Sequence, residues 1–194
     1  MRYTGIDMLD GLRERLSAYE PRRIEREDAP RAAVLIPLYE KEGTHHVIFQ
    51  VRTELVEHHK GQISFPGGAH DEGDADLLMT ALRETEEEIG LQREDVEVLG
   101  QLDDIVTITN FLVTPFVGRV TRPAPYPFAP SGFEVAELLE VPLPHLHEPA
   151  TLANEPVPWR DRMVPPPAYR FGEHVIWGAT ARLLQRFLEL SRAT

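Results

Sequence analysis

The chain has 194 residues, of which 42% are hydrophobic and 27% charged, and its 32 acidic against 20 basic side chains give a formal charge of −12. These values fit one globular domain, residues 1–194, with enough apolar side chains for a core. A net negative charge disfavours DNA or RNA as a partner, because such contacts depend on Lys and Arg at phosphates. Cysteine is absent, which excludes disulfides, thiolate nucleophiles and zinc sites with Cys ligands.

The sequence also bears on where the protein acts and on what. No apolar run approaches the roughly 18 residues needed to span a bilayer, and the first residues lack the basic-then-apolar order of a signal peptide. We therefore expect a cytoplasmic protein without membrane segments, and the sequence is silent on its oligomeric state. An acidic protein can still process a small phosphorylated metabolite if divalent cations lie between its carboxylates and the phosphates.

The first predicted elements are a helix and a pair of strands. Residues 1–20 are predicted to contain an amphipathic helix that ends before Pro21, since they include leucines at helical spacing: Leu9, Leu12 and Leu16. Apolar and β-branched runs at 32–39 and 46–51 predict two strands. Lys41-Glu42-Gly43 between them predicts a turn.

A glycine-containing segment precedes a second predicted helix. Residues 62–65 predict a short strand, and Pro66-Gly67-Gly68 predicts a loop because proline and paired glycines favour irregular backbone. Asp74 is the predicted N-cap of a helix over about 75–89, and Gly90 is its predicted left-handed C-terminal cap. This helix has a stripe that we expect to face the core: Leu78, Leu82, Thr85 and Ile89.

The second half of the chain alternates predicted strands with proline-rich loops. Strands are predicted at 96–99, 102–109 and 111–120. Residues 134–139 predict one or two helical turns, and 141–167 is expected to be mostly loop. The last predicted elements are short strands near 160–164 and 169–171 and a helix over about 178–190.

Three glutamates of the second predicted helix carry the clearest chemical signal. At about 100° per residue, Glu84, Glu87 and Glu88 fall within one arc of about 100° and share one helix face. Like charges at this spacing destabilise a helix by a few tenths of a kcal/mol per pair, which a hard cation with oxygen ligands would offset. The alternative for such a run taken alone is a solvated face. Its position favours a site, because the bare backbone of Gly67-Gly68 just upstream can approach a metal or phosphate.

Residues 68–91 resemble the Nudix box. The general box reads G, five residues, E, seven residues, R-E-U-x-E-E-x-G-U with U aliphatic, and the matching run here is Arg83-Glu84-Thr85-Glu86-Glu87-Glu88-Ile89-Gly90-Leu91. Asp74 stands where the first Glu is usual, with one residue more before Arg83, and Thr85 replaces an aliphatic residue. The catalytic half of the box matches residue by residue.

The resemblance implies an α/β Nudix fold, in which a mixed β-sheet is sandwiched between α-helices. It implies binding of one to three divalent cations, Mg²⁺ or Mn²⁺, by Glu84, Glu87, Glu88 and often the Gly68 carbonyl. Arg83 would orient the acidic loop, and water would attack one phosphorus of an X-linked nucleoside diphosphate. Glu134 is a candidate general base, with a surface or capping carboxylate as the alternative.

Upstream of the box, the chain resembles the branch of this family that cleaves coenzyme A. The motif of that branch, L-L-T-x-T-[SA]-x3-R-x3-G-x3-F-P-G-G, is matched by Ile48, Phe49, Thr53, Gly61 and Phe65-Pro66-Gly67-Gly68. Gln50 and Arg52 replace threonines, and Glu57 stands where the motif has Arg. The end of the chain also resembles this branch, at Val141-Pro142-Leu143 and in the segment 176–181.

This second resemblance implies hydrolysis of the pyrophosphate of coenzyme A to 4′-phosphopantetheine and adenosine 3′,5′-bisphosphate. The candidate contacts of its phosphates are Arg52, His59, Lys60 and the backbone of Gly67 and Gly68. One alternative is a Nudix pyrophosphatase for ADP-ribose or NADH, favoured if Glu57 removes recognition of the coenzyme. Another is a nucleotide-sensing Nudix module without turnover, which would suit a chain with eroded metal carboxylates.

Overall fold

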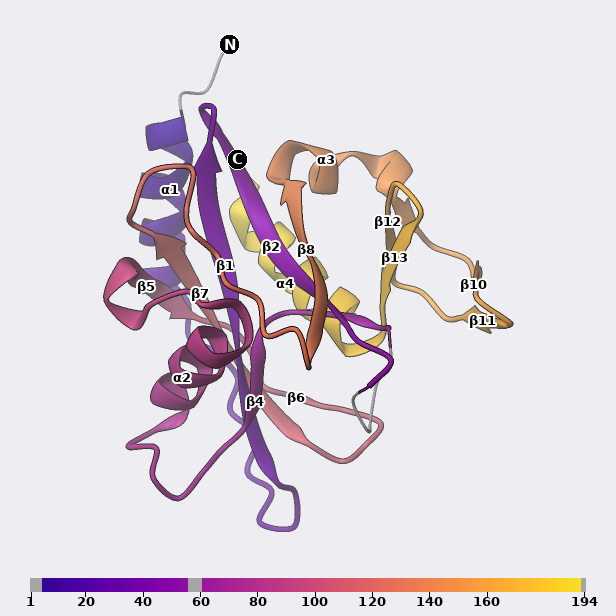
Figure 1. The fold of residues 1–194 in the computed structure, drawn as a ribbon, viewed down its shortest axis with the longest axis horizontal. Coiled ribbons are helices and arrows are strands. Elements are labelled where there is room, and N and C mark those ends of the chain that lie inside the picture. The colour runs from indigo at the N-terminus through magenta and orange to yellow at the C-terminus, as the bar shows by residue number, and fades with distance from the viewer. Residues whose placement is uncertain (1–4, 56–60, 193–194) are drawn as a thin grey trace.

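A mixed β-sheet is the centre of the structure, a computed structural model that describes residues 5–55 and 61–192 (Figure 1). Among these residues, eight strands form the sheet: β1 Arg31–Lys41, β2 Thr44–Arg52, β3 Ile63–Ser64, β4 Gly67–Ala69, β5 Val96–Gln101, β6 Ile105–Val106, β7 Leu112–Val120 and β8 Val135–Pro142. The main path is β3-β2-β1-β7-β5, with β4 on β1, β6 on β7 and β8 on β2. β1 and β7 run parallel, whereas the other pairs are antiparallel.

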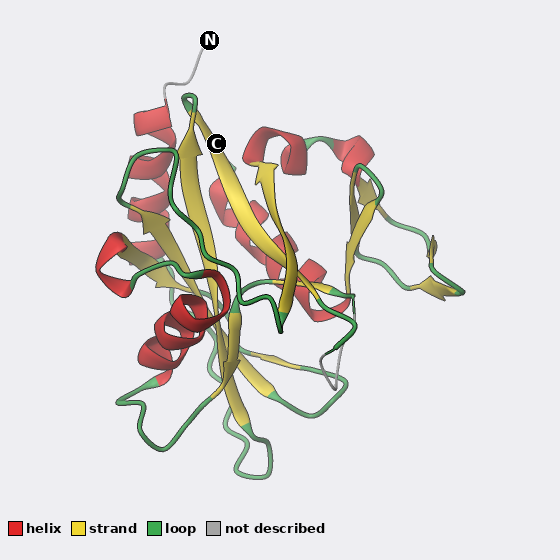
Figure 2. Cartoon of the chain, viewed as in Figure 1, coloured by secondary structure: helices red, strands yellow, loops and turns green. Residues whose placement is uncertain are grey.

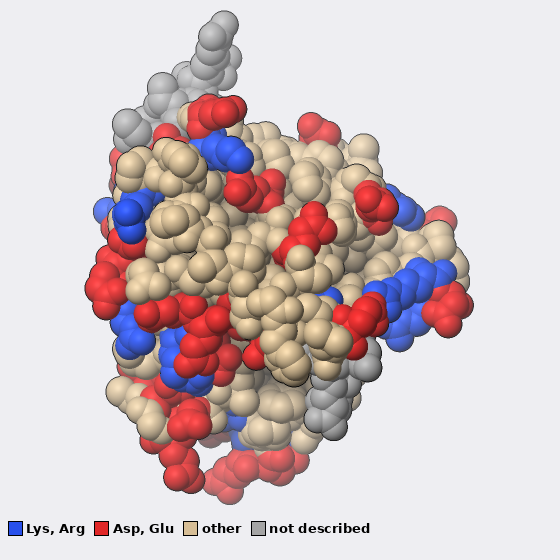
Figure 3. Space-filling model, viewed as in Figure 1, with Lys and Arg blue, Asp and Glu red and all other residues tan. Residues whose placement is uncertain are grey.

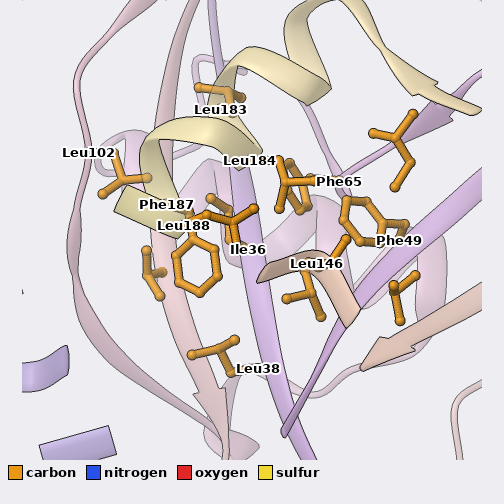
Figure 4. Close-up of a cluster of buried hydrophobic side chains, with 14 of the residues drawn as sticks. Ile36, Leu38, Phe49, Phe65, Leu102, Leu146, Leu183, Leu184, Phe187 and Leu188 are labelled. Atoms are coloured by element: carbon orange, nitrogen blue, oxygen red, sulfur yellow. The ribbon is translucent and has the colours of Figure 1, made fainter. Parts of the chain in front are cut away.

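Helices cover both faces of this sheet (Figure 2). They are α1 Gly5–Ala18, α2 Leu77–Ile89, the short α3 Leu143–His147 and α4 Gly178–Ser191. Successive residues of a strand point to opposite faces, and β1 accordingly feeds two apolar clusters. Leu35 and Tyr39 belong to the cluster that contains α2. Ile36 and Leu38 belong to the one that contains α1 and α4, shown in part in Figure 4. The predicted α/β fold, a mixed sheet between helices, is confirmed.

The C-terminal part adds two small sheets beside the main one. β9 Leu152–Ala153, β12 Ala168–Phe171 and β13 His174–Trp177 form one of them, and the other is a hairpin of β10 Val157–Trp159 and β11 Arg162–Val164. The hairpin projects from the rest of the molecule (Figure 1). None of the described helices combines the length and apolar character that crossing a membrane requires.

Several predicted elements are confirmed with small changes of boundary. The N-terminal helix is α1, and its leucines Leu9, Leu12 and Leu16 are buried. The first two strands are β1 and β2, and they meet at a turn where Glu42 and Gly43 have positive φ. Gly90 caps α2 with a left-handed φ of 71°, and the last helix is α4.

Other predictions are wrong, and pairing in the sheet explains two of them. Residues 134–139 contain strand rather than helix, because β8 pairs with the free side of β2 along almost its whole length. The predicted loop at 66–68 gives way to β4, which pairs with β1. Of 102–109 only β6 is strand. Residues 141–167 contain α3, β9 and β10 in addition to loop, whereas the short strands predicted near 160–164 and 169–171 are confirmed as β11 and β12. The N-cap of α2 is Asp76 instead of Asp74, since Asp76 accepts a hydrogen bond from the Met79 amide.

Candidate active site

The three box glutamates on α2 have different surroundings. Glu88 is only 3% exposed, Glu84 is 19% exposed and Glu87 is 60% exposed. The shared acidic face therefore runs from the interior at Glu88 to solvent at Glu87. The buried end is the unusual one, because a carboxylate is rarely buried unless it has partners.

Glu88 has partners from β2 and β4. Gln50 Nε2 and the Gly67 amide both donate to Glu88 Oε2 at 2.8 Å, and Arg52 Nη1 lies 3.1 Å from Oε1. Burial raises the pKa of Glu88 to about 7, while these three donors act in the opposite direction and favour the charged form. Glu88 is thus poised to change its charge near neutral pH.

Gly68 lies directly against Glu84. A Cβ added at Gly68 would lie 2.5 Å from Glu84 Oε2, so a larger residue would displace the carboxylate. Gly67 is equally constrained, because its φ of 146° and its contact with the backbone of β1 leave no room for a side chain. Burial raises the pKa of Glu84. Because Gly67 and Gly68 have no side chains, their backbone can lie next to the carboxylates of Glu88 and Glu84.

Arg83 connects α2 to the loop that precedes it. Its Nε and Nη2 atoms form a fork with the two carboxylate oxygens of Asp74, at 2.9 and 3.0 Å, and Nη2 also donates to the Ala69 carbonyl at 3.3 Å. Hydrogen bonding to Arg83 holds the pKa of Asp74 well below its usual range. Arg83 also pairs with Glu84 at 2.9 Å and Glu87 at 3.1 Å. It therefore fixes the loop and both outer glutamates together, and Asp74 serves as an anchor instead of a helix cap.

Arg52 lies between Glu88 and Glu134. Its Nη2 atom is 3.5 Å from Glu134 Oε2, and Glu134 is 43% exposed. The segment that carries Glu134 is positioned by two backbone hydrogen bonds, from Ser131 to the Glu88 carbonyl at 2.8 Å and from Thr53 to the Glu134 carbonyl at 2.9 Å. The candidate base is thus brought to the same site as the box glutamates.

Two candidate residues, His59 and Lys60, lie outside the described residues, as does Glu57. Gln50 also belongs to the site, although its role there was not predicted. The available signal was a polar residue within the apolar run of β2, and the structure shows Gln50 fully buried against Glu88.

The donor set fits a hard divalent cation in chemistry. Carboxylate oxygens and a backbone carbonyl are ligands that suit Mg²⁺ or Mn²⁺, and Gly68 lets the Glu84 carboxylate approach the backbone. No three His, Asp or Glu side chains within the described part of the chain converge closely enough to hold an ion together. Binding one cation with all three glutamates therefore requires side chains to move. Among the contacts that hold these glutamates, the one between Arg83 and Glu87 lies nearest to solvent.

Comparison with known proteins identifies a family for this chain. Residues 29–159, more than half of the chain, match the NUDIX domain family. The chain belongs to the Nudix hydrolase family.

Individual relatives agree with this assignment. An uncharacterized Nudix hydrolase, NudL, of Photorhabdus laumondii is 32% identical over 169 residues, which cover 87% of this chain and 88% of the relative. The protein of the same name in Pectobacterium atrosepticum is 42% identical over 113 residues, 58% of this chain and 57% of the relative. A NUDIX hydrolase crystal structure from Alicyclobacillus acidocaldarius superposes with a TM-score of 0.56 at 18% identity, covering 87% of this chain and 95% of that one. This last similarity supports the fold alone.

Proposed function

We propose that the chain is a metal-dependent pyrophosphohydrolase that cleaves coenzyme A or its derivatives to 4′-phosphopantetheine and adenosine 3′,5′-bisphosphate. One observation carries the reaction type: Glu84 and the buried Glu88 are held beside the backbone of Gly67 and Gly68. Carboxylates beside a backbone without side chains can bind divalent cations, and such cations can in turn bind the phosphates of a substrate.

Each residue of the site has a defined part in this proposal. Glu84, Glu87, Glu88 and the Gly68 carbonyl would hold Mg²⁺ or Mn²⁺, and such ions supply charge neutralisation and an acidified water when bound. Arg83 keeps the loop before α2 in place through Asp74. Glu134 is a candidate to accept a proton from the attacking water, since it lies at the site and is partly exposed.

Support for coenzyme A comes from where the branch motif lies. Phe65 stacks on Phe49 with ring centroids 4.8 Å apart, which seats β3 on β2. The Thr53 hydroxyl donates to the Phe133 carbonyl at 2.6 Å, next to Glu134. The Gly67 amide donates to Glu88. The motif residues thus frame the site, which supports a role of the motif in substrate choice.

Product analysis by chromatography tests both the proposed reaction and the proposed substrate. Coenzyme A, ADP-ribose and NADH are each incubated with Mg²⁺ and the protein, its Glu88→Gln variant or its Glu86→Gln variant. Glu86 is the matched control because it lies on the same helix but pairs with Arg93. We expect preferential conversion of coenzyme A, lost only in Glu88→Gln.

The other outcomes separate the alternatives. Preference for ADP-ribose or NADH would retain the metal site and discard coenzyme A as substrate. Nucleotide binding without turnover of any substrate would instead indicate a sensing module.

A further inference from the structure

The β10–β11 hairpin carries a cluster of arginine and tryptophan side chains. The Arg162 guanidinium lies 4.5 Å from the ring centroid of Trp177 and 5.1 Å from that of Trp159, and Arg160 lies 4.8 Å from the Trp159 ring. The two tryptophan rings are 5.2 Å apart. In Figure 3 this hairpin shows as a Lys/Arg patch on a surface rich in Asp and Glu.

Arg162 is exposed, and no carboxylate of the described residues lies within ion-pair distance of it. Arg160, its neighbour on the hairpin, pairs with Glu54. A guanidinium held against aromatic rings keeps its N–H donors free, in a plane that suits a phosphate. The cluster is therefore a preorganised anion site in a protein of charge −12.

This cluster is connected to the candidate active site through β2. Glu54, the partner of Arg160, follows Arg52 by two residues, a span of at most roughly 7 Å, and Arg52 contacts Glu88. Arg160 also packs over Gly61, where any Cβ would collide with the guanidinium. Gly61 is one of the residues of the coenzyme A motif, so motif and hairpin are in direct contact.

We propose that Arg162, held between Trp159 and Trp177, binds the phosphate monoester at the nucleotide end of the substrate. This inference rests on the proposed function, in which the pyrophosphate occupies the site on α2. A phosphate monoester carries a charge of about −1.5 to −2 near pH 7, so it is the group that an unpaired arginine distinguishes best. Coenzyme A has such a group on its ribose, whereas ADP-ribose and NADH do not. The hairpin thus makes the enzyme selective for a 3′-phosphorylated nucleotide.

Steady-state kinetics with coenzyme A and dephospho-coenzyme A test this selectivity. The unmodified protein is expected to have the higher kcat/KM for coenzyme A. Arg162→Gln should lower that value about tenfold or more, as expected for the loss of a charged hydrogen bond, and leave dephospho-coenzyme A unchanged. Arg162→Lys should retain part of the preference. Arg170→Gln, which changes an exposed arginine on β12, is the matched control and should change neither substrate.

Each other outcome is decisive. Equal kcat/KM for the two substrates in the unmodified protein would overturn the inference and leave pyrophosphate hydrolysis standing. An equal loss for both substrates in Arg162→Gln would show a structural role and also overturn it. If neither substrate is turned over, the proposed function fails, and calorimetry decides the inference by itself. Tighter binding of adenosine 3′,5′-bisphosphate than of adenosine 5′-monophosphate, lost in Arg162→Gln, supports it, and equal binding overturns it.

Discussion

Burial of the Glu88 carboxyl group makes the free energy of unfolding depend on pH. Its pKa is about 7 in the folded chain against an ordinary 4.5. Because the folded value is raised, the cost of burying the charge is absent below about pH 4.5 and fully present above about pH 7. The free energy of unfolding of the metal-free protein should therefore fall as the pH rises from about 4.5 to about 7, by roughly 3 kcal/mol in total from this group.

Urea denaturation in the presence of EDTA at pH 5.5 and pH 8 measures this effect. Glu88→Gln removes the titrating group, so its stability should depend less on pH over this range. Glu86→Gln should retain the dependence of the unmodified protein, because Glu86 pairs with Arg93 near the surface. Parallel pH profiles for the unmodified protein and Glu88→Gln would contradict the assignment.

The Arg83–Asp74 fork gives a second prediction for a single side chain. Lysine keeps the charge of Arg83 but offers no planar pair of donors for the two oxygens of Asp74, which is only 6% exposed. Arg83→Lys should lower the free energy of unfolding by about 1 to 3 kcal/mol and reduce turnover, because the loop before α2 loses its anchor. Stability is measured with urea, and turnover with coenzyme A and Mg²⁺.

Arg93→Lys is the control for this change. Arg93 pairs with Glu86 at 2.9 Å, with its side chain 41% exposed, and exposed pairs contribute only about 0 to 1 kcal/mol. If the two lysine variants were equally stable, the Asp74 fork would have no special role.

Single helices and strands show where sequence alone succeeds. The leucine spacing in α1 and the Gly90 cap of α2 are local signals, and both elements were predicted. β8 was not, because Glu134 to Leu139 are mostly good helix formers and the apolar spacing of Val135 and Leu139 is also helical. In the structure this segment pairs with the free side of β2 and forms a strand, because pairing between distant segments overrides local propensity.

The candidate site shows the same division. The box glutamates, Arg83 and the two glycines could be named from their spacing, because the relevant positions lie within one short segment. Gln50, the partner of Glu88, lies on β2 and not on α2. Only the register of β2 against β3 and β8 places Gln50 beside Glu88. The Arg162 cluster brings together residues of β11 and β13. It could therefore not be predicted from the order of residues in the sequence.

The C-terminus of α2 provides a prediction that couples helix capping to the site. Gly90 has a φ of 71°, and an added Cβ would lie 2.8 Å from the Ala129 backbone nitrogen. Gly90→Ala should therefore cost more than the about 1 kcal/mol of backbone strain alone. It should also lower kcat, because the displaced segment carries Glu134.

Gly172→Ala is the control that separates the effect of backbone strain from that of displacing the segment at Ala129. Gly172 also has a positive φ, of 58°, but its Cβ would meet nothing within 4 Å. That variant should lose about 1 kcal/mol of stability through strain and keep its kcat. Equal effects of the two substitutions on kcat would refute the link between the Gly90 cap and the site.

For the chain as a whole, α1 lies outside the segment that matches the family, which begins at residue 29, yet it is part of the main core. Leu12 is fully buried, and Leu16 packs over Gly100 of β5. Arg15 donates to the Leu190 carbonyl at 2.6 Å, and just beyond the helix Tyr19 contacts Asp103. The N-terminal helix is thus a component of the fold.

We therefore expect Leu12→Ala to lower the free energy of unfolding by about 2 to 5 kcal/mol, the cost of a cavity in a close-packed core. This is a large share of the roughly 5 to 15 kcal/mol that stabilises a typical domain. A chain lacking residues 1–20 should consequently lose cooperative unfolding in urea. Ile108→Ala is the control, because Ile108 is 97% exposed and its truncation should change stability by less than about 0.5 kcal/mol. Should the shortened chain unfold cooperatively with the stability of the full chain, α1 would be an appendage whose buried leucines contribute nothing to the core.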